Sequence, residues 1–543
     1  MKSRVPGGEE PMFSMNFNNL RPLPWVIVTV LFLMTTPMAQ ANGNKVAFTG
    51  GTVLTVSGPV IEGGVILVED GIITAVGEGD TEIPYDAMEV DCTGMILAPG
   101  FVDPHSADGL DIPNENLPKA PFVDVFDAID PSRFFFEDSL RNGVTTIHVM
   151  QGNNCVVGGV SRIVHPIGLS PHEMSRQAGV AMKLSTSPRQ GYDRLRQLAE
   201  LREVFSEYDR WRENLAEKRF EQEAKKDDDL EPLPPEEARQ KGEELIRDED
   251  LDDQHRNLAH LVDGRLGAWI YCGSASDVAP ALALISDRGW QKNSVLVLGG
   301  DAHLAVSEID DSNLAVILDA DLVYRKRDPI HGELIETFIP DIYRGAGVKF
   351  AIQPSRTGSM PERFLGYQAA RLVRSGVSPE DALRIVTLGA AEICGVADRY
   401  GSIEVGKVGN LVMWTGDPLD LTSWVQKVWV EGILAYDREK DARLERLFPE
   451  AAEEPEPPAP LDDAETSEED GDGDSAAEDG DQPKGDEAAD PQPLKEKSTE
   501  KDKKEAPDKK PVPPDDKPDD KPDDKPDDKP DDKPDDKPTV GEV

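Results

Sequence analysis

The stretch Ala98-Pro99-Gly100-Phe101-Val102-Asp103-Pro104-His105-Ser106-Ala107-Asp108-Gly109 brings one histidine to the end of a short apolar run. Short β-type runs precede this stretch, and a long alternation of strand-like and helix-like segments follows it. In a (β/α)8 barrel the loops after the strands converge at one end, where the chemistry takes place. The sequence therefore predicts an α/β fold, a (β/α)8 TIM-like barrel, whose first strand delivers His105 to that end.

The later strands and helices of this barrel are expected at regular intervals along the chain. Runs of β-branched and apolar residues indicate strands, and amphipathic segments with capping residues indicate helices. Ser378 is a suitable N-cap and Pro379 a suitable first residue for the last of these helices. The expected strands are 143–150, 181–185, 267–272, 294–300, 314–318 and 348–352, and the expected helices are 134–140, 275–288 and 377–395.

The overall charge excludes one class of partner. The 543-residue chain has a formal net charge of -47. Nucleic-acid binding needs a basic face, so we expect no nucleic-acid partner. The four cysteines, at positions 92, 155, 272 and 394, lack the spacing of a zinc site or a disulfide framework. We expect them to be small buried side chains.

The N-terminus has the pattern of an export signal. Arg21 precedes an uncharged run over 24–36, and Ala39-Gln40-Ala41 has the form of a cleavage site. We therefore predict a signal peptide over 1–41 and an exported protein, periplasmic or extracellular, with no stable membrane span after cleavage. An uncleaved N-terminal anchor is the alternative.

Several motifs resemble one enzyme family. The stretch 98–109 resembles the first-strand motif of the amidohydrolase superfamily, Pro-Gly-Phe-hydrophobic-Asp-x-His-x-His. Gly143-Val144-Thr145-Thr146 and the run 401–414 resemble further family motifs, and Gln151–Gly159 resembles the Gly-rich loop of the imidazolonepropionase-like branch. The resemblance covers about 45–437. It implies a barrel over 98–400 and a small flanking β-sandwich built from both ends of the domain, 45–97 and 401–440.

Two segments fall outside this resemblance. Residues about 192–257 are dominated by charged side chains, which indicates one or two solvated helices inserted in the barrel, with a lid or a partner-binding arm as the alternative. Residues 450–543 form an acidic, proline-rich tail that ends in Asp-Asp-Lys-Pro repeats. Such a composition cannot bury enough apolar surface to fold, so we expect a disordered tail.

The resemblance also implies a catalytic metal, zinc or another divalent ion, but the ligand set departs from the family pattern. His105 matches the first histidine, whereas the second position holds Ala107. Tyr271 and Gly299 stand near the places of the histidines on strands five and six. After strand eight no carboxylate occurs before Glu362.

Substitute ligands are conceivable at the barrel mouth. His303 is a candidate metal ligand, and Asp301 and Glu362 are candidate catalytic carboxylates. Lys183 stands where some relatives carry a carboxylated bridging lysine, although a lysine that reaches out to solvent is the plainer interpretation. The further residues that could converge there are His148 and Asp108.

Two hypotheses about function stay open. The first is a hydrolase that cleaves C–N bonds in cyclic amide-like small molecules with a modified metal site, since hydrolysis of this kind uses a metal-activated water and a proton carrier. The second is a non-catalytic relative, without a metal, that serves as a scaffold or binding protein, with an intact amidohydrolase paralogue as its partner. Metal content separates the two.

Overall fold

The computed structural model describes residues 44–226, 233–354 and 364–447. The predicted signal peptide, Glu362 and the predicted tail over 450–543 lie outside the described residues. Among the described residues, no helix combines the length and the apolar character needed to cross a bilayer.

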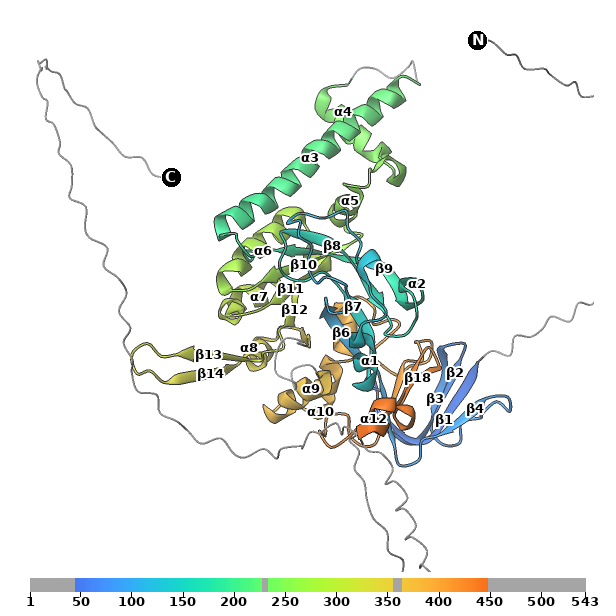
Figure 1. Cartoon of the computed structure of the whole chain (residues 1–543). Coiled ribbons are helices and arrows are strands. Elements are labelled where there is room, and N and C mark those ends of the chain that lie inside the picture. The colour runs from blue at the N-terminus through green and yellow to red at the C-terminus, as the bar shows by residue number, and fades with distance from the viewer. Residues whose placement is uncertain (1–43, 227–232, 355–363, 448–543) are drawn as a thin grey trace, which may run out of the picture. The chain divides into compact units, whose positions relative to one another are not determined.

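One eight-stranded sheet curves into a nearly closed barrel (Figure 1). Its strands are short and mostly buried on both faces, as expected for strands that are covered by helices outside and by side chains inside. The sheet order is β15-β12-β11-β10-β9-β8-β7-β6. The strands are β6 (Phe101–Ser106), β7 (Val144–Val149), β8 (Val157–Val164), β9 (Ser175–Ser185), β10 (Gly267–Cys272), β11 (Ser294–Leu298), β12 (Ala315–Leu318) and β15 (Phe350–Ile352).

Strand β8 departs from the predicted all-parallel barrel, because it pairs antiparallel with both β7 and β9. The segment 150–156 that joins β7 to β8 is too short for a crossover helix, and a short connection returns the chain antiparallel. The interpretation of 151–159 as a Gly-rich loop is therefore wrong for its last residues, since 157–159 belong to β8.

A second difference from the prediction concerns the helix that precedes the end of the domain, and it is explained by a contact with β6, the last strand at one edge of the barrel sheet. The predicted helix over 377–395 is divided into α10 (Pro379–Ile385) and α11 (Leu388–Ile393). At the break, the carbonyl of Val386 accepts a hydrogen bond of 2.9 Å from the backbone N–H of Val102 in β6. The carbonyl of Val386 therefore bonds to β6 and not to a residue of its own helix, and the helix is interrupted there.

A second eight-stranded sheet joins both ends of the domain. β5 and β16 pair antiparallel, which connects the segment before the barrel with the segment after it. Its core includes an edge-to-face contact of Phe48 and Trp429, with ring centroids 4.8 Å apart. That these strands form a two-layered sandwich stays a prediction. The strands are β1 (Lys45–Val53), β2 (Ile61–Glu69), β3 (Ile72–Gly77), β4 (Met88–Asp91), β5 (Ile96–Pro99), β16 (Leu411–Trp414), β17 (Val425–Val430) and β18 (Ile433–Asp437).

The connections complete the domain. A two-stranded ribbon follows β12, and short helices link the other barrel strands or follow the last one. All four cysteines are buried and free, as expected. The ribbon consists of β13 (Val323–Arg327) and β14 (Leu334–Phe338). The helices are α1 (Phe134–Arg141), α2 (Pro171–Met174), α5 (Arg256–Val262), α6 (Ala275–Arg288), α7 (Val306–Ser312), α8 (Ile339–Ala346), α9 (Leu365–Arg374) and α12 (Ala442–Leu447).

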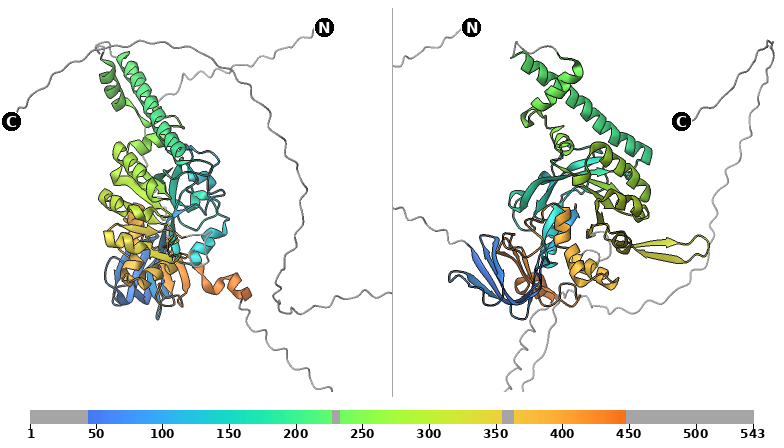
Figure 2. Two further views of the ribbon diagram at one scale, coloured as in Figure 1. Left: turned by 90° about the vertical axis from the view of Figure 1, so that its left-hand side faces the viewer. Right: turned by 180° about the vertical axis from the view of Figure 1, so that it is seen from behind.

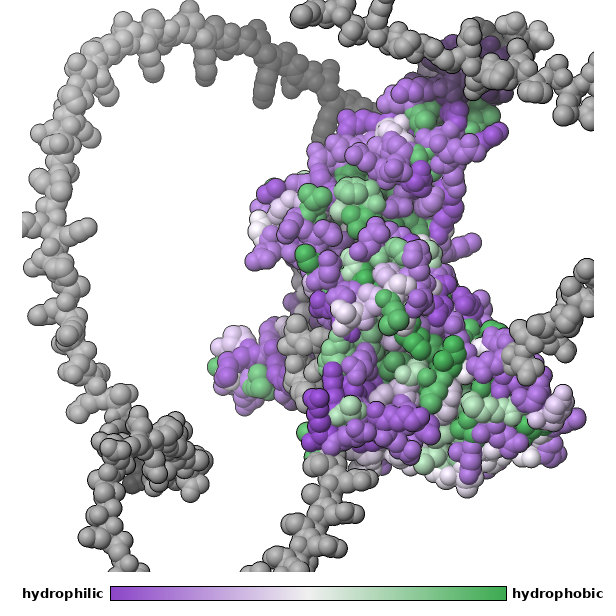
Figure 3. All heavy atoms as spheres, turned by 45° about the vertical axis from the view of Figure 1, so that its right-hand side comes forward, coloured by the Kyte–Doolittle hydropathy of each residue, from purple (hydrophilic) through white to green (hydrophobic). Residues whose placement is uncertain are grey.

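The charged segment between β9 and β10 forms a helical arm. Helices α3 (Arg194–Ala224) and α4 (Pro235–Leu245) lie side by side and extend away from the barrel sheet (Figure 2). Hydrophilic side chains cover most of the arm surface in the view of Figure 3. The helices contact closely at Gly242, where a side chain would meet the backbone of Ala216.

Replacing Gly242 by alanine is expected to detach α4 from α3. The new Cβ would lie 2.0 Å from the carbonyl oxygen of Ala216, which is helix backbone and cannot yield without bending α3. Such overpacking costs about 1–3 kcal/mol. We expect faster amide exchange over 235–245, with the thermal unfolding of the barrel unchanged. The exposed control Glu244→Ala should leave amide exchange over 235–245 unaltered. If α4 made no close contact with α3, Gly242→Ala would instead stabilise the helix and slow this exchange.

Candidate functional site

His105 lies at the C-terminal end of β6, as predicted, and its side chain is only 6% exposed. Its backbone N–H donates a 3.2 Å hydrogen bond to Oδ1 of Asp103, which fixes the turn of the chain at this end. Burial, followed by the neighbouring Lys183 and His148, holds the pKa of His105 well below its usual range. The imidazole is therefore neutral.

Lys183, near the end of β9, is fully buried, with 0% of its surface exposed. The interpretation of Lys183 as a lysine that reaches out to solvent is wrong. Its Nζ lies 2.8 Å from Nε2 of His105, although 78 residues separate the two in the sequence. Desolvation lowers the pKa of Lys183 to about 7. The barrel thus pairs an amine with a neutral imidazole at the C-terminal ends of two strands.

The side chains around this pair do not provide the set of ligand atoms that a divalent metal needs. His105 Nε2 faces the amine of Lys183, and both ring nitrogens of His148 are engaged, Nδ1 at 3.0 Å from the Pro104 carbonyl and Nε2 at 2.6 Å from Ser161 Oγ. Within 44–226, 233–354 and 364–447, no three His, Cys, Asp or Glu side chains gather as metal ligands. A structural metal site needs four protein ligands, and a catalytic one about three. Zinc, or another divalent metal, stays a prediction for this chain.

Tyr271 of β10 is the next polar group along the mouth. Lys183 Nζ lies 5.8 Å from the centroid of the Tyr271 ring. Its hydroxyl is close to Gly273 and Gly299, at both of which an added Cβ would approach the Tyr271 oxygen to 3.0 Å. Burial raises the pKa of Tyr271 to about 12. The hydroxyl therefore keeps its proton and can donate a hydrogen bond.

A pocket of about 310 Å³ opens beside Tyr271, at the C-terminal ends of β11 and β12. Gly299 and His303 line it, together with Tyr343, whose hydroxyl is buried without a hydrogen-bond partner. The His303 ring packs against Tyr324 of the β13–β14 ribbon, with centroids 4.7 Å apart. His303 thus belongs to this pocket and does not contact the Lys183–His105 pair.

The remaining candidates have other partners. Oδ1 of Asp301 accepts a 2.9 Å hydrogen bond from the backbone N–H of Ala275, the first residue of α6. This contact satisfies a free donor at the start of a helix, which is a structural role. The backbone N–H of Asp108 donates to Ser106 Oγ at 3.3 Å. The only other candidate, Glu362, lies outside the described residues.

Two residues with long-range contacts escaped the sequence analysis, one beside the site and one at the end of β8. Gln353, just after β15, lies beside His105, where it opposes the lowering of the His105 pKa, and it donates from Nε2 to Asp319 Oδ1 at 3.3 Å. His165, at the end of β8, looked like an ordinary loop residue, but it is fully buried and lies 3.2 Å from Nδ2 of Asn410. Neither contact has a local signature, because each joins segments distant in the sequence.

Acid is expected to destabilise the fold through its buried histidines. Burial, with Arg176 and Arg399 nearby, holds the pKa of His165 well below its usual range. The unfolded chain takes up a proton near pH 6.5, while the folded chain does not. The free energy of unfolding therefore falls as the pH drops below about 6.5, by up to about 1.4 kcal/mol per pH unit for each such histidine.

Urea unfolding between pH 7 and pH 5 measures the slope of the free energy of unfolding against pH. His165→Gln should make the slope shallower by the equivalent of one proton, whereas His172→Gln, at an exposed position, should leave it unchanged. A His165→Gln slope equal to that of the wild type would mean that His165 is charged in the folded protein.

Comparison with known proteins points to one superfamily. The model of the Amidohydrolase family matches residues 347–435. An imidazolonepropionase of Pseudomonas putida (strain GB-1) is 36% identical over 99 residues, 17% of this chain and 24% of that protein. One of Pseudomonas fluorescens (strain Pf-5) is 38% identical over 87 residues, 15% of this chain and 21% of that protein. The chain therefore spans about a quarter of the length of these curated relatives.

The fold is shared with an amidohydrolase from Thermotoga maritima MSB8. That structure aligns with a TM-score of 0.60 and 24% identity over 72% of this chain and 100% of its own. The match of the family model and the imidazolonepropionase-like segment lie within a chain that has this same fold. The chain thus shares its fold with an amidohydrolase, and residues 347–435 within it match the model of the Amidohydrolase family.

Proposed function

We propose that this protein hydrolyses C–N bonds in small cyclic amide-like molecules at the C-terminal mouth of its barrel. The observation that carries the proposal is the buried contact between Lys183 and His105, 2.8 Å apart, at the end where barrel enzymes place their chemistry. The curated relatives are imidazolonepropionases, and an imidazolone is a ring of this kind. Export to the periplasm or the extracellular space stays part of the proposal.

The residues at the mouth divide the work of hydrolysis. Water attacks the carbonyl carbon, and the Lys183–His105 pair accepts the proton that the water loses. The same pair gives the proton to the leaving nitrogen as the C–N bond breaks, so the pair returns to its starting protonation state. The Tyr271 hydroxyl donates to the carbonyl oxygen as charge develops on it. The adjacent pocket, lined by His303 and Tyr343, holds the rest of the ring.

A second candidate is a non-catalytic relative that binds small molecules or an intact amidohydrolase paralogue. It is favoured by the ligand chemistry described above, since the described residues bring no three metal-binding side chains together. In this case the barrel positions a ligand and the Lys183–His105 pair only fills the interior.

Activity and metal content together test the two candidates. The full chain, purified without chelator, is assayed against lactams, hydantoins and imidazolones, and its metal is measured before and after zinc is added. Turnover of a ring substrate by protein without bound metal supports the proposal. Turnover that depends on about one tightly bound zinc per chain, lost in His105→Ala, overturns the role given to Lys183 and His105. No turnover in either preparation favours the binding protein.

A further inference from the structure

The end of β6 that carries His105 is irregular. In its ladder with β7 the register shifts between Asp103 and Ser106, so that Pro104 and His105 stand opposite a single residue of β7, His148. Such a β-bulge bends the strand and re-aims a side chain, and bulges are frequent next to active sites. The shape of this bulge therefore decides where the His105 imidazole points.

Two side chains bond the backbone of the bulge. The carbonyl oxygen of Pro104 lies 3.0 Å from Nδ1 of His148. The backbone N–H of His105 donates to Oδ1 of Asp103 at 3.2 Å. Because Asp103 belongs to β6 itself, His148 is the group of the two that ties the bulge to a neighbouring strand.

The hydrogen bonds of His148 decide which ring nitrogen carries its proton. Burial lowers the pKa of His148 to about 3, although the Pro104 carbonyl opposes this shift, so the ring is neutral and has one N–H. A carbonyl oxygen only accepts, so Nδ1 carries the proton and donates to Pro104. Nε2 is then a bare acceptor, and the hydroxyl of Ser161, 2.6 Å away, donates to it.

Ser161 continues this chain of hydrogen bonds to the strand of Lys183. Its Oγ accepts a 3.0 Å bond from the backbone N–H of Ala181, where the register of β8 and β9 is shifted. Ala181 lies two residues before Lys183 on β9. His148 and Ser161 are fully buried, and a buried network whose members are all satisfied is rigid. The chain thus runs from β9 through β8 and β7 to the bulge in β6.

Aromatic packing restrains the same ring. Trp269 of β10 makes an edge-to-face contact with His148, with ring centroids 4.5 Å apart and an interplanar angle of 84°. The Trp269 ring is also nearly parallel to that of His105, at an angle of 10° and a centroid distance of 6.4 Å. The indole therefore lies beside both imidazoles and limits the rotation of each.

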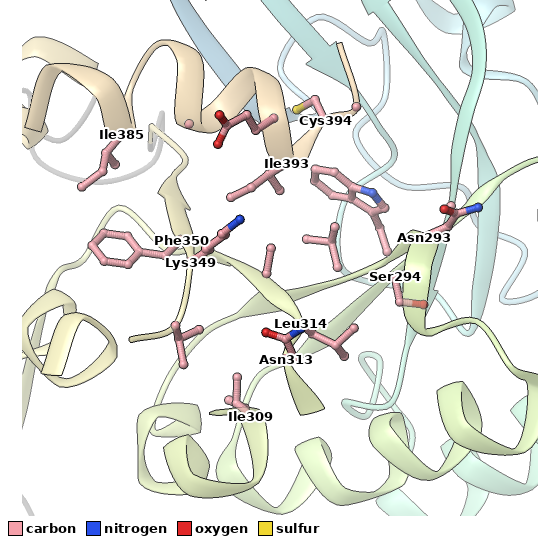
Figure 4. Close-up of a pocket in the computed structure, with 18 of the residues that line it drawn as sticks. Asn293, Ser294, Ile309, Asn313, Leu314, Lys349, Phe350, Ile385, Ile393 and Cys394 are labelled. Atoms are coloured by element: carbon pink, nitrogen blue, oxygen red, sulfur yellow. The ribbon is translucent and has the colours of Figure 1, made fainter. Parts of the chain in front are cut away.

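Cys394 is a further group near the Pro104 carbonyl. Its Sγ lies 3.8 Å from this oxygen and 4.0 Å from Nδ1 of His148. Figure 4 shows Cys394 at the edge of a cavity of about 990 Å³, which opens at the opposite end of the barrel, at the N-terminal ends of β10, β11, β12 and β15. A thiol is a weak donor, so the stronger hydrogen bond to the carbonyl comes from His148.

We propose that His148 is a positioning residue for the hydrolysis described above. It holds the Pro104 carbonyl through Nδ1–H, so the bulge keeps one shape and His105 Nε2 stays 2.8 Å from Lys183 Nζ. The Ser161 hydroxyl fixes the tautomer that can do this, because it donates to Nε2. His148 exchanges no proton with the substrate, since both of its nitrogens are engaged. The role given to His148 rests on the proposed function, but the geometry behind it can be tested without a substrate.

Nitrogen NMR of the full chain, labelled with ¹⁵N-histidine, tests the proposal. The wild type should show His148 protonated at Nδ1 and bare at Nε2, with no change between pH 8 and pH 5. His148→Leu removes the donor to Pro104 and should shift the ring signals of His105. His148→Asn should leave them close to their wild-type positions, because the asparagine amide N–H stands at about the place of Nδ1.

Two matched variants separate this role from general packing. His165→Leu removes another fully buried histidine and should destabilise the fold without shifting the His105 signals. Cys394→Ala removes the thiol and keeps His148, so it should shift them much less than His148→Leu does. The proposal is overturned if His148 is protonated at Nε2, or if His148→Leu leaves the His105 signals unmoved. Equal shifts in His148→Leu and His148→Asn, or in His148→Leu and Cys394→Ala, overturn it as well.

Kinetics distinguish a failure of this role from a failure of the proposed function. On a ring substrate that is turned over, His148→Leu should lower kcat by about 10-fold to 100-fold, the effect of a misplaced group, while KM changes by less than about 2-fold. His148→Asn should stay close to the wild type. A loss confined to KM, or an equal loss of kcat in both variants, overturns the positioning role. If no substrate is found, the NMR signals still decide it, and only the proposed function fails.

Discussion

Replacing Lys183 by methionine is expected to lower kcat/KM for C–N hydrolysis by about 10²-fold to 10⁴-fold, the contribution of a positioned proton carrier. Methionine follows the path of the lysine stem and fills nearly the same volume, but it can neither accept nor return a proton. The fully buried amine lies 2.8 Å from His105 Nε2, so its removal affects the pair directly. Steady-state kinetics on whichever ring substrate the screen identifies measures the loss.

Stability separates a chemical role from a structural one. The substitution replaces a buried amine by an apolar group of similar volume, and His105 loses one polar neighbour. We therefore expect the urea midpoint of Lys183→Met to stay close to that of the wild type, since volume-conserving changes usually cost less than about 1.5 kcal/mol. The exposed control Lys326→Met on β13 should retain activity. Full activity in folded Lys183→Met would contradict the proposed mechanism.

Replacing Gly100 by alanine is expected to unfold the protein or to destabilise it by about 3 kcal/mol or more, above the usual range for overpacking. An added Cβ would lie 2.0 Å from Thr145 Oγ1 and 2.3 Å from Thr145 Cγ2. Thr145 belongs to β7 and is buried, so it has little room to move. The Gly100 N–H also donates to the Asn410 carbonyl at 3.1 Å, which holds the backbone in place.

The same substitution at Gly345 is the matched control. Gly345 lies within α8, and a Cβ there would meet nothing within 4 Å. Gly345→Ala should therefore be neutral, or stabilise the helix by up to about 1 kcal/mol. Equilibrium urea unfolding of both variants measures the difference. A Gly100→Ala variant as stable as Gly345→Ala would mean that β6 and β7 do not approach as closely as described.

Local sequence signals predicted much of the barrel. The run before His105 became β6, and the segments expected as helices over 134–140 and 275–288 became α1 and α6. At Ser378 the predicted N-cap is confirmed, since its Oγ accepts a hydrogen bond from the Asp381 N–H at 3.0 Å. Periodicity and capping act over a few residues, so the sequence carries them directly.

Long-range contacts account for what was missed. The direction of β8 depends on which neighbours it pairs with, and the break between α10 and α11 depends on a hydrogen bond to β6. Neither feature has a local sequence pattern. A buried apolar strand, for example, has the same pattern of residues in a parallel and in an antiparallel sheet. The position of Lys183 was ambiguous for the same reason, since nothing in its own segment indicates whether its end is buried.

The sequence by itself determined the resemblance to the amidohydrolases, the first barrel strand and the residue at its end, because a specific motif surrounds His105. It also identified Lys183 as a residue of interest. Only the tertiary structure decided that these two side chains meet, that His303 and Asp301 have partners elsewhere, and that a cavity lies at the far end of the barrel. Those facts depend on which strands become neighbours when the sheet curves, and residues 78 positions apart carry no sign of that in their own segments.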